Sequence, residues 1–254
     1  MKEKVNYGYP LNVIFILMAI SILIFLSLFL LSLFQSTLFL LAYIIIFFVI
    51  IIIAITFFKN RFDKKRLSIL NKMISLSSLK GNELVLDIGT GSGFLAIGFA
   101  KKLKKGKIIG IDRYNLKYDK LKSEIIGKIK INFFGNTLKN AKHNAIIENV
   151  DKKCNFFIKD ITKTLDFDTS FFDIILTSQV LYCIPKGKLE EVLSEVDRIL
   201  KKNGKIIFFE TKSFLNWNLE DIKSYFENKN YKIKILKTTE YKKFHILYGQ
   251  KLDI

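Results

Sequence analysis

The feature that most constrains this chain is an uncharged stretch. From Pro10 to Phe58 the sequence contains no Asp, Glu, Lys, Arg or His. Within it, Leu11 to Leu33 and Leu38 to Phe58 are almost wholly apolar runs of about 23 and about 21 residues. At about 1.5 Å rise per residue, each run is long enough as a helix to cross a hydrocarbon core of about 30 Å. The sequence therefore predicts a transmembrane helical hairpin over residues 1–58.

The residues that flank the two runs predict an orientation. The only polar interruption between the runs is the short link Gln35 to Thr37, which forces the helices to be antiparallel. Lys2 and Lys4 precede the first run, and five basic residues follow the second: Lys59, Arg61, Lys64, Lys65 and Arg66. Because basic residues favour the cytoplasmic side, both ends are expected there. The prediction is a multi-pass membrane protein with two helices, whose globular part is cytoplasmic.

Two other structures could account for the apolar stretch, a cleaved signal peptide and a buried helical hairpin. A cleaved signal peptide has an apolar region of about 7 to 15 residues and a small-residue cleavage site, whereas this stretch is longer, lacks an A-x-A pattern and leads into a second run. A buried helical hairpin in a water-soluble protein needs a partner that covers apolar residues on every face. The sequence shows no such partner.

The charge of the remaining chain limits its partners only loosely. The net charge of +18 suits an anionic membrane surface or a nucleic acid, but scattered Lys in a compositionally biased sequence also simply solvates a surface. There is no zinc-finger spacing, no aromatic RNP-type strand and no basic region running into heptads. The lipid bilayer is therefore the expected partner, and nucleic acid is not. Cys154 and Cys183 form no C-x-x-C pair, which fits a reducing cytosol.

Residues 59–80 predict a basic, amphipathic connector. Its apolar and small residues fall at helical spacing at Leu67, Leu70, Met73, Ile74 and Ser77. Two roles stay open for this connector. It could lie over a cofactor pocket as a lid, or it could be a linker helix that packs on a sheet.

A glycine-rich turn follows the connector and carries the main chemical signal. Glu83 to Gly93 reads E-L-V-L-D-I-G-T-G-S-G, a strand that ends in an acid and a G-x-G-x-G turn, followed by a helix-like segment. A dinucleotide fingerprint needs a third glycine at position 94, where this chain has Phe94. Asp87 also places a negative charge where a pyrophosphate would lie. S-adenosylmethionine (SAM) has no phosphate and carries positive amino and sulfonium groups, so it suits the turn better.

A second acid supports a bound nucleoside. About twenty residues after the first acid, Lys107 to Ile111 predicts another apolar strand, and it ends in Asp112. From this position a carboxylate accepts hydrogen bonds from both ribose hydroxyls. The cofactor-binding residues expected at the turn and at this strand end are Asp87, Gly89, Thr90, Gly91, Gly93 and Asp112.

Residues 81–254 resemble a class I SAM-dependent methyltransferase. The later segments that carry the likeness are N-T-L-K-N-A-K-H-N-A (136–145), C-N-F-F-I-K-D-I (154–161), F-D-I-I-L-T-S-Q-V-L-Y-C-I-P (172–185), the helix 189–200, the K-N-G turn at 202–204, the strand 206–210, the helix 219–228 and the strands 231–236 and 244–249. The resemblance implies a doubly wound α/β fold with a mostly parallel, seven-stranded, Rossmann-like sheet. The whole chain is also similar to prokaryotic membrane-anchored methyltransferases.

The resemblance implies further site residues. It puts Asp160 near the adenine amino group, Ile161 against the base, and Ser178 at the cofactor beyond the fourth strand. Tyr182 is the best candidate to position the acceptor, through its ring or its hydroxyl. One departure is the segment 113–135, which is longer than usual and either covers the substrate entrance or is a solvated excursion.

The remaining residue types leave the acceptor open. His143 is expected on an exposed helix face and His245 in a structural position, so neither is expected to be a general base. No cluster of His and carboxylates suggests a metal. Three hypotheses follow: methyl transfer to a membrane-resident acceptor such as a lipid headgroup or a quinone, methyl transfer to a soluble small molecule or protein with the hairpin only as anchor, and a non-catalytic SAM-binding scaffold. The first is preferred because an anchor raises the local concentration of a membrane substrate.

Overall fold

The computed structural model describes residues 5, 11–32, 37–114, 137–185, 187–214 and 217–253. The chain divides into two compact units, Gly8–Leu67 and Ser68–Ile254 together with Met1–Tyr7. The division falls inside the predicted connector. The predicted link at residues 35–36, and the insert at 113–135 apart from Arg113 and Tyr114, lie outside the described residues.

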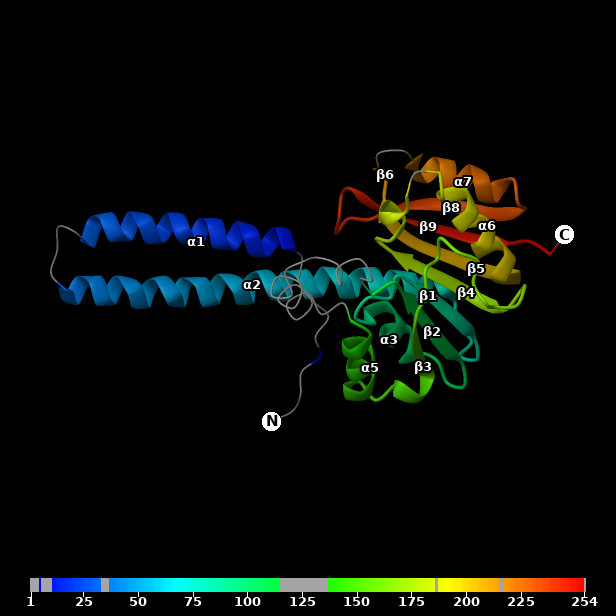
Figure 1. The fold of residues 1–254 in the computed structure, drawn as a ribbon, viewed down its shortest axis with the longest axis horizontal. Helices are drawn as coiled ribbons and strands as arrows, with labels where there is room; N and C mark the ends of the chain where they lie inside the picture. Colours follow the sequence, from blue (N-terminus) through cyan, green and yellow to red (C-terminus); the bar gives the residue numbers. More distant parts are fainter. Residues whose placement is uncertain are drawn as a thin grey trace. The chain divides into compact units, whose positions relative to one another are not determined.

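The first unit contains two apolar helices, α1 (Leu11–Ser32) and the N-terminal part of α2 (Thr37–Ser77), which run side by side (Figure 1). Phe25 of α1 packs against Phe47 of α2, with ring centroids 5.7 Å apart. Within the described part of the chain, no helix combines the length and the hydropathy that crossing a membrane requires. The two predicted helices are thus present, while their crossing of a membrane stays a prediction.

The second unit is built around a twisted sheet with strand order β3-β2-β1-β4-β5-β9-β8, seven strands within the described residues (Figure 1). Five strands are parallel, and β9 and β8 add to the β5 edge in antiparallel register. The strands are β1 (Leu84–Ile88), β2 (Lys107–Asp112), β3 (Cys154–Ile158), β4 (Phe172–Ser178), β5 (Leu200–Thr211), β8 (Tyr231–Lys237) and β9 (Phe244–Lys251). The prediction of a mostly parallel, seven-stranded sheet is confirmed.

Helices cover both faces of this sheet, as a doubly wound fold requires. One face packs against α3 (Phe94–Ala100), α5 (Leu138–Ile147) and the C-terminal turns of α2. The other packs against α6 (Leu189–Ile199), α7 (Leu219–Glu227) and the short helix η3 (Leu181–Cys183). A further short helix is η2 (Asp151–Lys153), and β6 (Ser213–Phe214) pairs with β7 (Trp217–Asn218).

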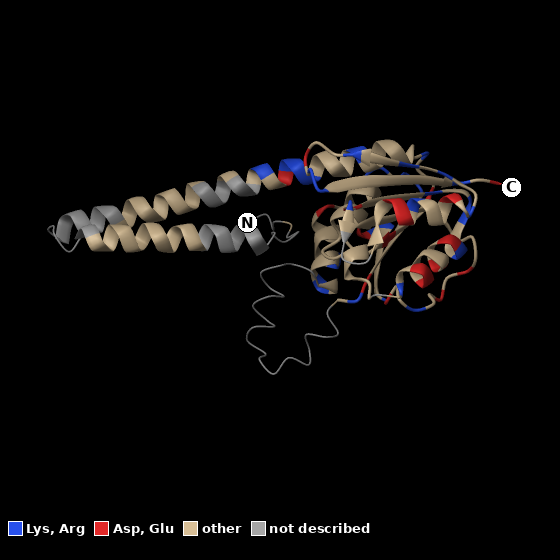
Figure 2. Cartoon of the chain, turned by 90° about the horizontal axis from the view of Figure 1, so that it is seen from above, with Lys and Arg blue, Asp and Glu red and all other residues tan. Residues whose placement is uncertain are grey.

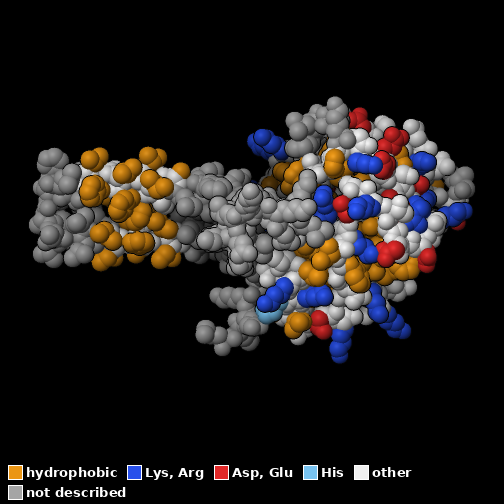
Figure 3. Space-filling model, in the orientation of Figure 1, with side chains coloured by type: hydrophobic (Ala, Val, Ile, Leu, Met, Phe, Trp, Pro, Cys, Tyr) orange, Lys and Arg blue, Asp and Glu red, His pale blue; other side chains and the backbone are white. Residues whose placement is uncertain are grey.

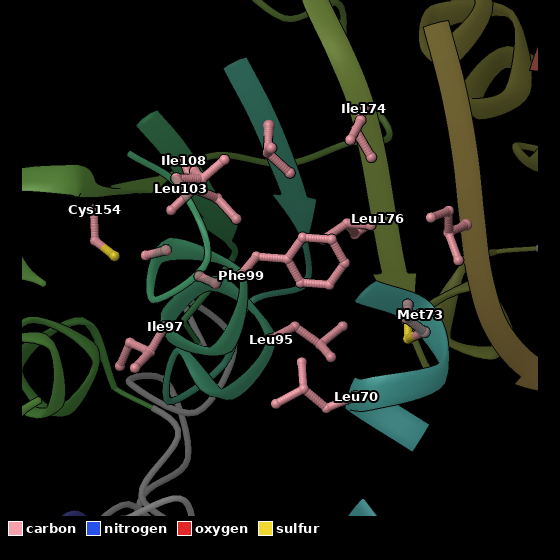
Figure 4. Close-up of a cluster of buried hydrophobic side chains, with 14 of the residues drawn as sticks. Leu70, Met73, Leu95, Ile97, Phe99, Leu103, Ile108, Cys154, Ile174 and Leu176 are labelled. Atoms are coloured by element: carbon pink, nitrogen blue, oxygen red, sulfur yellow. The ribbon is translucent and has the colours of Figure 1, made fainter. Parts of the chain in front are cut away.

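The end of α2 is part of the core of the second unit. Met73 is 0% exposed, and Leu70 contacts α3 so closely that a Cβ on Gly98 would lie 2.4 Å from Leu70 Cδ2. Figure 4 shows Leu70 and Met73 beside Leu95 and Phe99 of α3. Of the two roles left open for the connector, this geometry matches the linker helix that packs on the sheet.

Two strand boundaries differ from the prediction. Strand β3 ends at Ile158, so Asp160 and Ile161 lie in the loop that follows it. The K-N-G residues expected to form a turn belong to β5, which already begins at Leu200. Leu200 pairs with Phe172, and the register then shifts so that Lys205 pairs with Ile174. Asn203 has a left-handed φ of 62°, so this segment is an irregularity within a longer strand.

Candidate cofactor site

The glycine-rich turn follows β1 and is hydrogen-bonded to the carboxyl end of the neighbouring strand β2. The N–H groups of Gly89 and Thr90 donate to the Ile111 carbonyl at 2.8 and 3.0 Å, and Gly91 N donates to Asp112 Oδ2 at 2.9 Å. Gly89 has φ 70°, which a residue with a Cβ adopts at a cost. An added Cβ would also lie 2.2 Å from Val180 Cγ2. Glycine is therefore required here both by the backbone conformation and by the close approach of Val180.

Asp87 lies beneath the turn and is 1% exposed. Its Oδ2 accepts hydrogen bonds from Thr90 Oγ1 at 2.7 Å and from Ala96 N at 3.2 Å, so the side chain ties the turn to the start of α3. Burial raises the pKa of Asp87 to about 7, and the charge of Asp112 adds to the rise, while the two hydrogen bonds oppose it. A nearby cationic group would lower this pKa and stabilise the ionised carboxylate.

Asp112 is half-buried at the end of β2 and faces the turn. In addition to Gly91 N, it binds the N–H of Tyr114, which donates to Oδ1 at 2.9 Å. Both carboxylate oxygens are thereby oriented by backbone groups. The predicted contact of this acid with a ribose stays a prediction.

Tyr114 is a further candidate site residue, which the sequence analysis did not identify. Its hydroxyl is buried and has no hydrogen-bond partner among the described residues. Burial raises the pKa of Tyr114, and the charges of Asp112 and Asp87 raise it further, so the phenol lies near both acids. A buried hydroxyl without a partner is costly, and a polar ligand between the two acids would satisfy it. A Tyr two residues after a strand-end acid was the available signal.

The residues predicted around the adenine lie in the loop after β3. Asp160 Oδ1 accepts from Thr162 N at 3.0 Å and Thr162 Oγ1 at 2.7 Å, and Arg113 Nε lies 3.3 Å from Oδ2. Partial burial works against ionisation, yet the Thr162 hydrogen bonds and the Arg113 charge lower the pKa of Asp160. Ile161 is 7% exposed and packs in the core cluster beneath the sheet. Contacts of either residue with a base stay predictions.

The segment after β4 packs against the glycine-rich turn, where Val180 approaches Gly89. Ser178 is the last residue of β4 and is half-buried, and Gln179 follows with a left-handed φ of 57°. Tyr182 is 40% exposed on η3, and burial raises its pKa to about 12. The structure thus brings Val180 to the cofactor turn and leaves the Tyr182 side chain accessible. Its predicted part in positioning an acceptor stays a prediction.

The histidines and cysteines add no second reactive centre. His143 is exposed on α5 as expected, whereas His245 on β9 is 8% exposed and its Nδ1 lacks a hydrogen-bond partner within the described ranges. Cys154 is buried and Cys183 is exposed, and both are free thiols. Across the described part of the chain, no group of three or more His, Cys, Asp or Glu could hold a metal ion.

The donor set fits SAM. Asp87 is buried where a positive group would lower its pKa, and Asp112 faces the turn as a ribose acceptor requires. The Tyr114 hydroxyl, buried without a partner among the described residues, offers a further polar contact near these acids. The arrangement therefore favours a nucleoside with a positive tail over a dinucleotide.

Comparisons with known proteins agree with this assignment. Residues 79–251 match the family model described as a methyltransferase domain. The chain is 31% identical over 129 residues to an uncharacterized methyltransferase of Schizosaccharomyces pombe, covering 51% of this chain and 40% of that protein. It is 34% identical over 110 residues to a release factor glutamine methyltransferase of Flavobacterium psychrophilum, covering 43% of this chain and 30% of the relative. The chain thus spans well under half the length of these curated relatives.

Solved structures share the fold at low sequence identity. A SAM-dependent methyltransferase from Aquifex aeolicus matches with TM-score 0.54 and 16% identity, over 72% of this chain and 89% of that chain. A putative methyltransferase from Bacillus halodurans matches with TM-score 0.52 and 18% identity, over 73% of this chain and 99% of that chain. At this level of identity the likeness concerns the fold alone.

Proposed function

Because this chain belongs to the methyltransferase domain family and its second unit is a class I SAM-dependent methyltransferase domain, we propose that it transfers the methyl group of SAM to a membrane-associated acceptor. The cofactor is SAM. The observation that carries the activity is the joint geometry of the glycine turn and two strand-end acids, in which Gly91 N donates to Asp112 Oδ2 at 2.9 Å above the buried Asp87.

The chain's own residues bind and orient in this proposal. SAM supplies a sulfonium methyl group, which is already a strong electrophile. Asp87 attracts the positive amino end of the cofactor, and Asp112 accepts from the ribose hydroxyls. Asp160, Ile161 and Ser178 contact the remaining parts of the nucleoside and tail. Since displacement at the methyl carbon depends mainly on alignment, holding donor and acceptor close accounts for much of the rate acceleration.

Tyr182 positions the acceptor. It is 40% exposed on the same segment whose Val180 packs on the cofactor turn. A ring at this place can stack on a cationic acceptor, and its hydroxyl can orient a polar one. With a pKa of about 12 the phenol stays protonated at neutral pH, which suits it to orient the acceptor rather than to remove a proton.

The membrane acceptor is supported by the first unit. Large apolar side chains of α1 and α2 are exposed, including Leu23 at 67% and Ile45, Ile52 and Ile53 at 63% each. Figure 3 shows such side chains over the described surface of both helices. Figure 2 shows Lys and Arg on α2 after its apolar part. An apolar surface of this extent is unfavourable in water and needs an apolar environment, which lipid supplies. The basic residues that follow it on α2 favour the cytoplasmic side of a membrane.

Labelling with SAM that carries a radioactive methyl group tests the proposal. Native membranes containing the full chain are incubated with labelled SAM and extracted with organic solvent, and Asp112→Ala membranes serve as the matched control. We expect label in the organic phase that depends on intact Asp112. Label confined to the aqueous or protein fraction would refute a lipid acceptor and support a soluble small molecule or protein. A purified chain in detergent that binds no SAM would refute both, and the scaffold as well.

A further inference from the structure

Glu210 is a buried carboxylate that the proposed reaction does not use. It lies near the end of β5 and is 0% exposed. Its Oε1 accepts from Thr177 Oγ1 at 2.9 Å and from Val180 N at 2.9 Å, and its Oε2 lies 3.2 Å from the same N–H. Burial raises the pKa of Glu210 to about 7, while N–H groups of Val180, Leu181 and Gln179 favour the ionised form. A carboxylate so deeply buried persists only because backbone donors satisfy it.

The backbone donors belong to the segment Ser178–Cys183, which runs from the last residue of β4 through η3, and Thr177 directly precedes this segment. The segment turns sharply at Gln179, whose left-handed φ of 57° is unfavourable for a residue with a side chain. Gln179 N donates to the Phe209 carbonyl at 2.9 Å, so β5 holds the turn through its backbone as well as through Glu210. The conformation of the segment therefore depends on the end of β5.

The same segment reaches both halves of the site. Val180 approaches the cofactor turn so closely that a Cβ on Gly89 would lie 2.2 Å from Val180 Cγ2. Tyr182 and Cys183 follow on η3, and the charge of Glu210 contributes to the raised pKa of each. A continuous set of contacts thus runs from Glu210 through Val180 to Gly89, and Tyr182 lies two residues further along.

We propose that Glu210 is a positioning residue that holds the segment Ser178–Cys183 so that Val180 forms a wall of the cofactor turn and Tyr182 faces the acceptor. Glu210 acts through Val180 and touches neither cofactor nor acceptor. The inference rests on the proposed function for its consequence, because the site it shapes is the proposed methyl-transfer site. The part of the inference that concerns structure, namely that Glu210 fixes the conformation of the segment, rests on the hydrogen bonds alone.

The two cysteines allow this hold to be measured directly. Cys183 is exposed within the segment, and the other cysteine of the chain, Cys154, is buried in β3. The rate at which dithionitrobenzoate modifies the full chain in detergent therefore reports on Cys183. Glu210→Gln removes the charge and an acceptor, and Thr177→Val removes one donor. Glu195→Gln is a matched control, because Glu195 is 8% exposed and accepts from Leu165 N at 2.8 Å, in a different loop.

We expect Glu210→Gln to raise the Kd for S-adenosylhomocysteine about tenfold, as the loss of a buried, charge-assisted hydrogen bond implies. We expect the same variant to speed Cys183 modification because the segment is released, and the rates are compared per ionised thiol, from their pH dependence, so that the lower thiol pKa without the Glu210 charge does not contribute. Thr177→Val should shift both readouts in the same direction by less. Glu195→Gln should stay within about twofold of the unmodified chain in both.

Three outcomes would overturn the inference. The first is a folded Glu210→Gln chain, judged by circular dichroism, with unchanged Kd and unchanged thiol rate. The second is an equal change in Glu195→Gln, which would indicate general destabilisation. The third applies if Glu210→Gln does not fold: it is a Thr177→Val chain whose Kd and thiol rate equal those of the unmodified chain. Failure of the unmodified chain to bind S-adenosylhomocysteine would refute the proposed function instead, and the thiol rates would still decide whether Glu210 holds the segment.

Discussion

The pH dependence of SAM binding is expected to come from Asp87. Burial raises the pKa of this carboxyl to about 7, and the amino group of SAM, which stays mostly protonated below about pH 7.5, favours its ionised form. At low pH the carboxyl is neutral and the attraction is lost. Affinity should therefore rise as pH increases through 7.

The size of the effect follows from the ionised fraction. With a pKa of about 7, roughly one-eleventh of Asp87 is ionised at pH 6 and roughly three-quarters at pH 7.5. If only the ionised form binds, the apparent Kd is the intrinsic value divided by that fraction. The Kd for SAM should therefore fall about eightfold between pH 6 and pH 7.5.

Calorimetric titration of the full chain in detergent measures this dependence. In Asp87→Asn the Kd should be higher at pH 7.5 and nearly constant between pH 6 and pH 7.5. Glu210 titrates in the same range, since burial raises its pKa to about 7 as well. An unchanged eightfold dependence in Asp87→Asn would refute the assignment to Asp87, and loss of the dependence in Glu210→Gln alone would transfer it to Glu210.

Three further tests address the site and the core, two of them with a control substitution. A left-handed residue with a side chain costs about 1–2 kcal/mol. Gly89→Ala should lower the free energy of unfolding by more than this amount, because its Cβ would meet Val180, and it should abolish SAM binding. Gly187→Ala is the control: at φ 81° an added Cβ has no atom within 4 Å, so this variant should lose only the roughly 1–2 kcal/mol and bind SAM normally. Met73→Ala should lower the free energy of unfolding in urea by about 2–5 kcal/mol, because the Met73 side chain is 0% exposed. Leu67→Ala is the control: Leu67 is 49% exposed, so the free energy of unfolding should change by less than about 0.5 kcal/mol. Asp112→Ala should raise the Kd for SAM at least about tenfold in calorimetry, and an unchanged Kd would remove this acid from the site.

Much of the domain fold could be predicted because it depends on local patterns. Strand-length apolar runs, glycines and acids at strand ends identify β1, β2 and the glycine-rich turn that follows β1, since backbone conformation and burial repeat within a few residues. Asp87 and Asp112 were found in this way, and the structure places both at the turn. The apolar runs of α1 and α2 were equally plain in the sequence.

Other features were not predictable because residues far apart in the chain decide them. Packing against α3 makes the end of α2 part of the core, and pairing with Phe172 draws Leu200 into β5. Similarly, the packing of the Ile161 side chain in the core cluster depends on residues far from it in the chain, and its predicted contact with the base stays a prediction.

The sequence by itself therefore determined the chemistry of the cofactor turn, because glycines and acids act there through their own backbone and charge. Only the tertiary structure decided what surrounds the turn. Val180 meets Gly89 across 91 positions of sequence, and Glu210 holds Val180 from another strand. The burial of the Tyr114 hydroxyl near two acids likewise has no local sequence pattern. Such contacts arise from the order of strands in the sheet, which brings the ends of β1, β2, β4 and β5 to one edge.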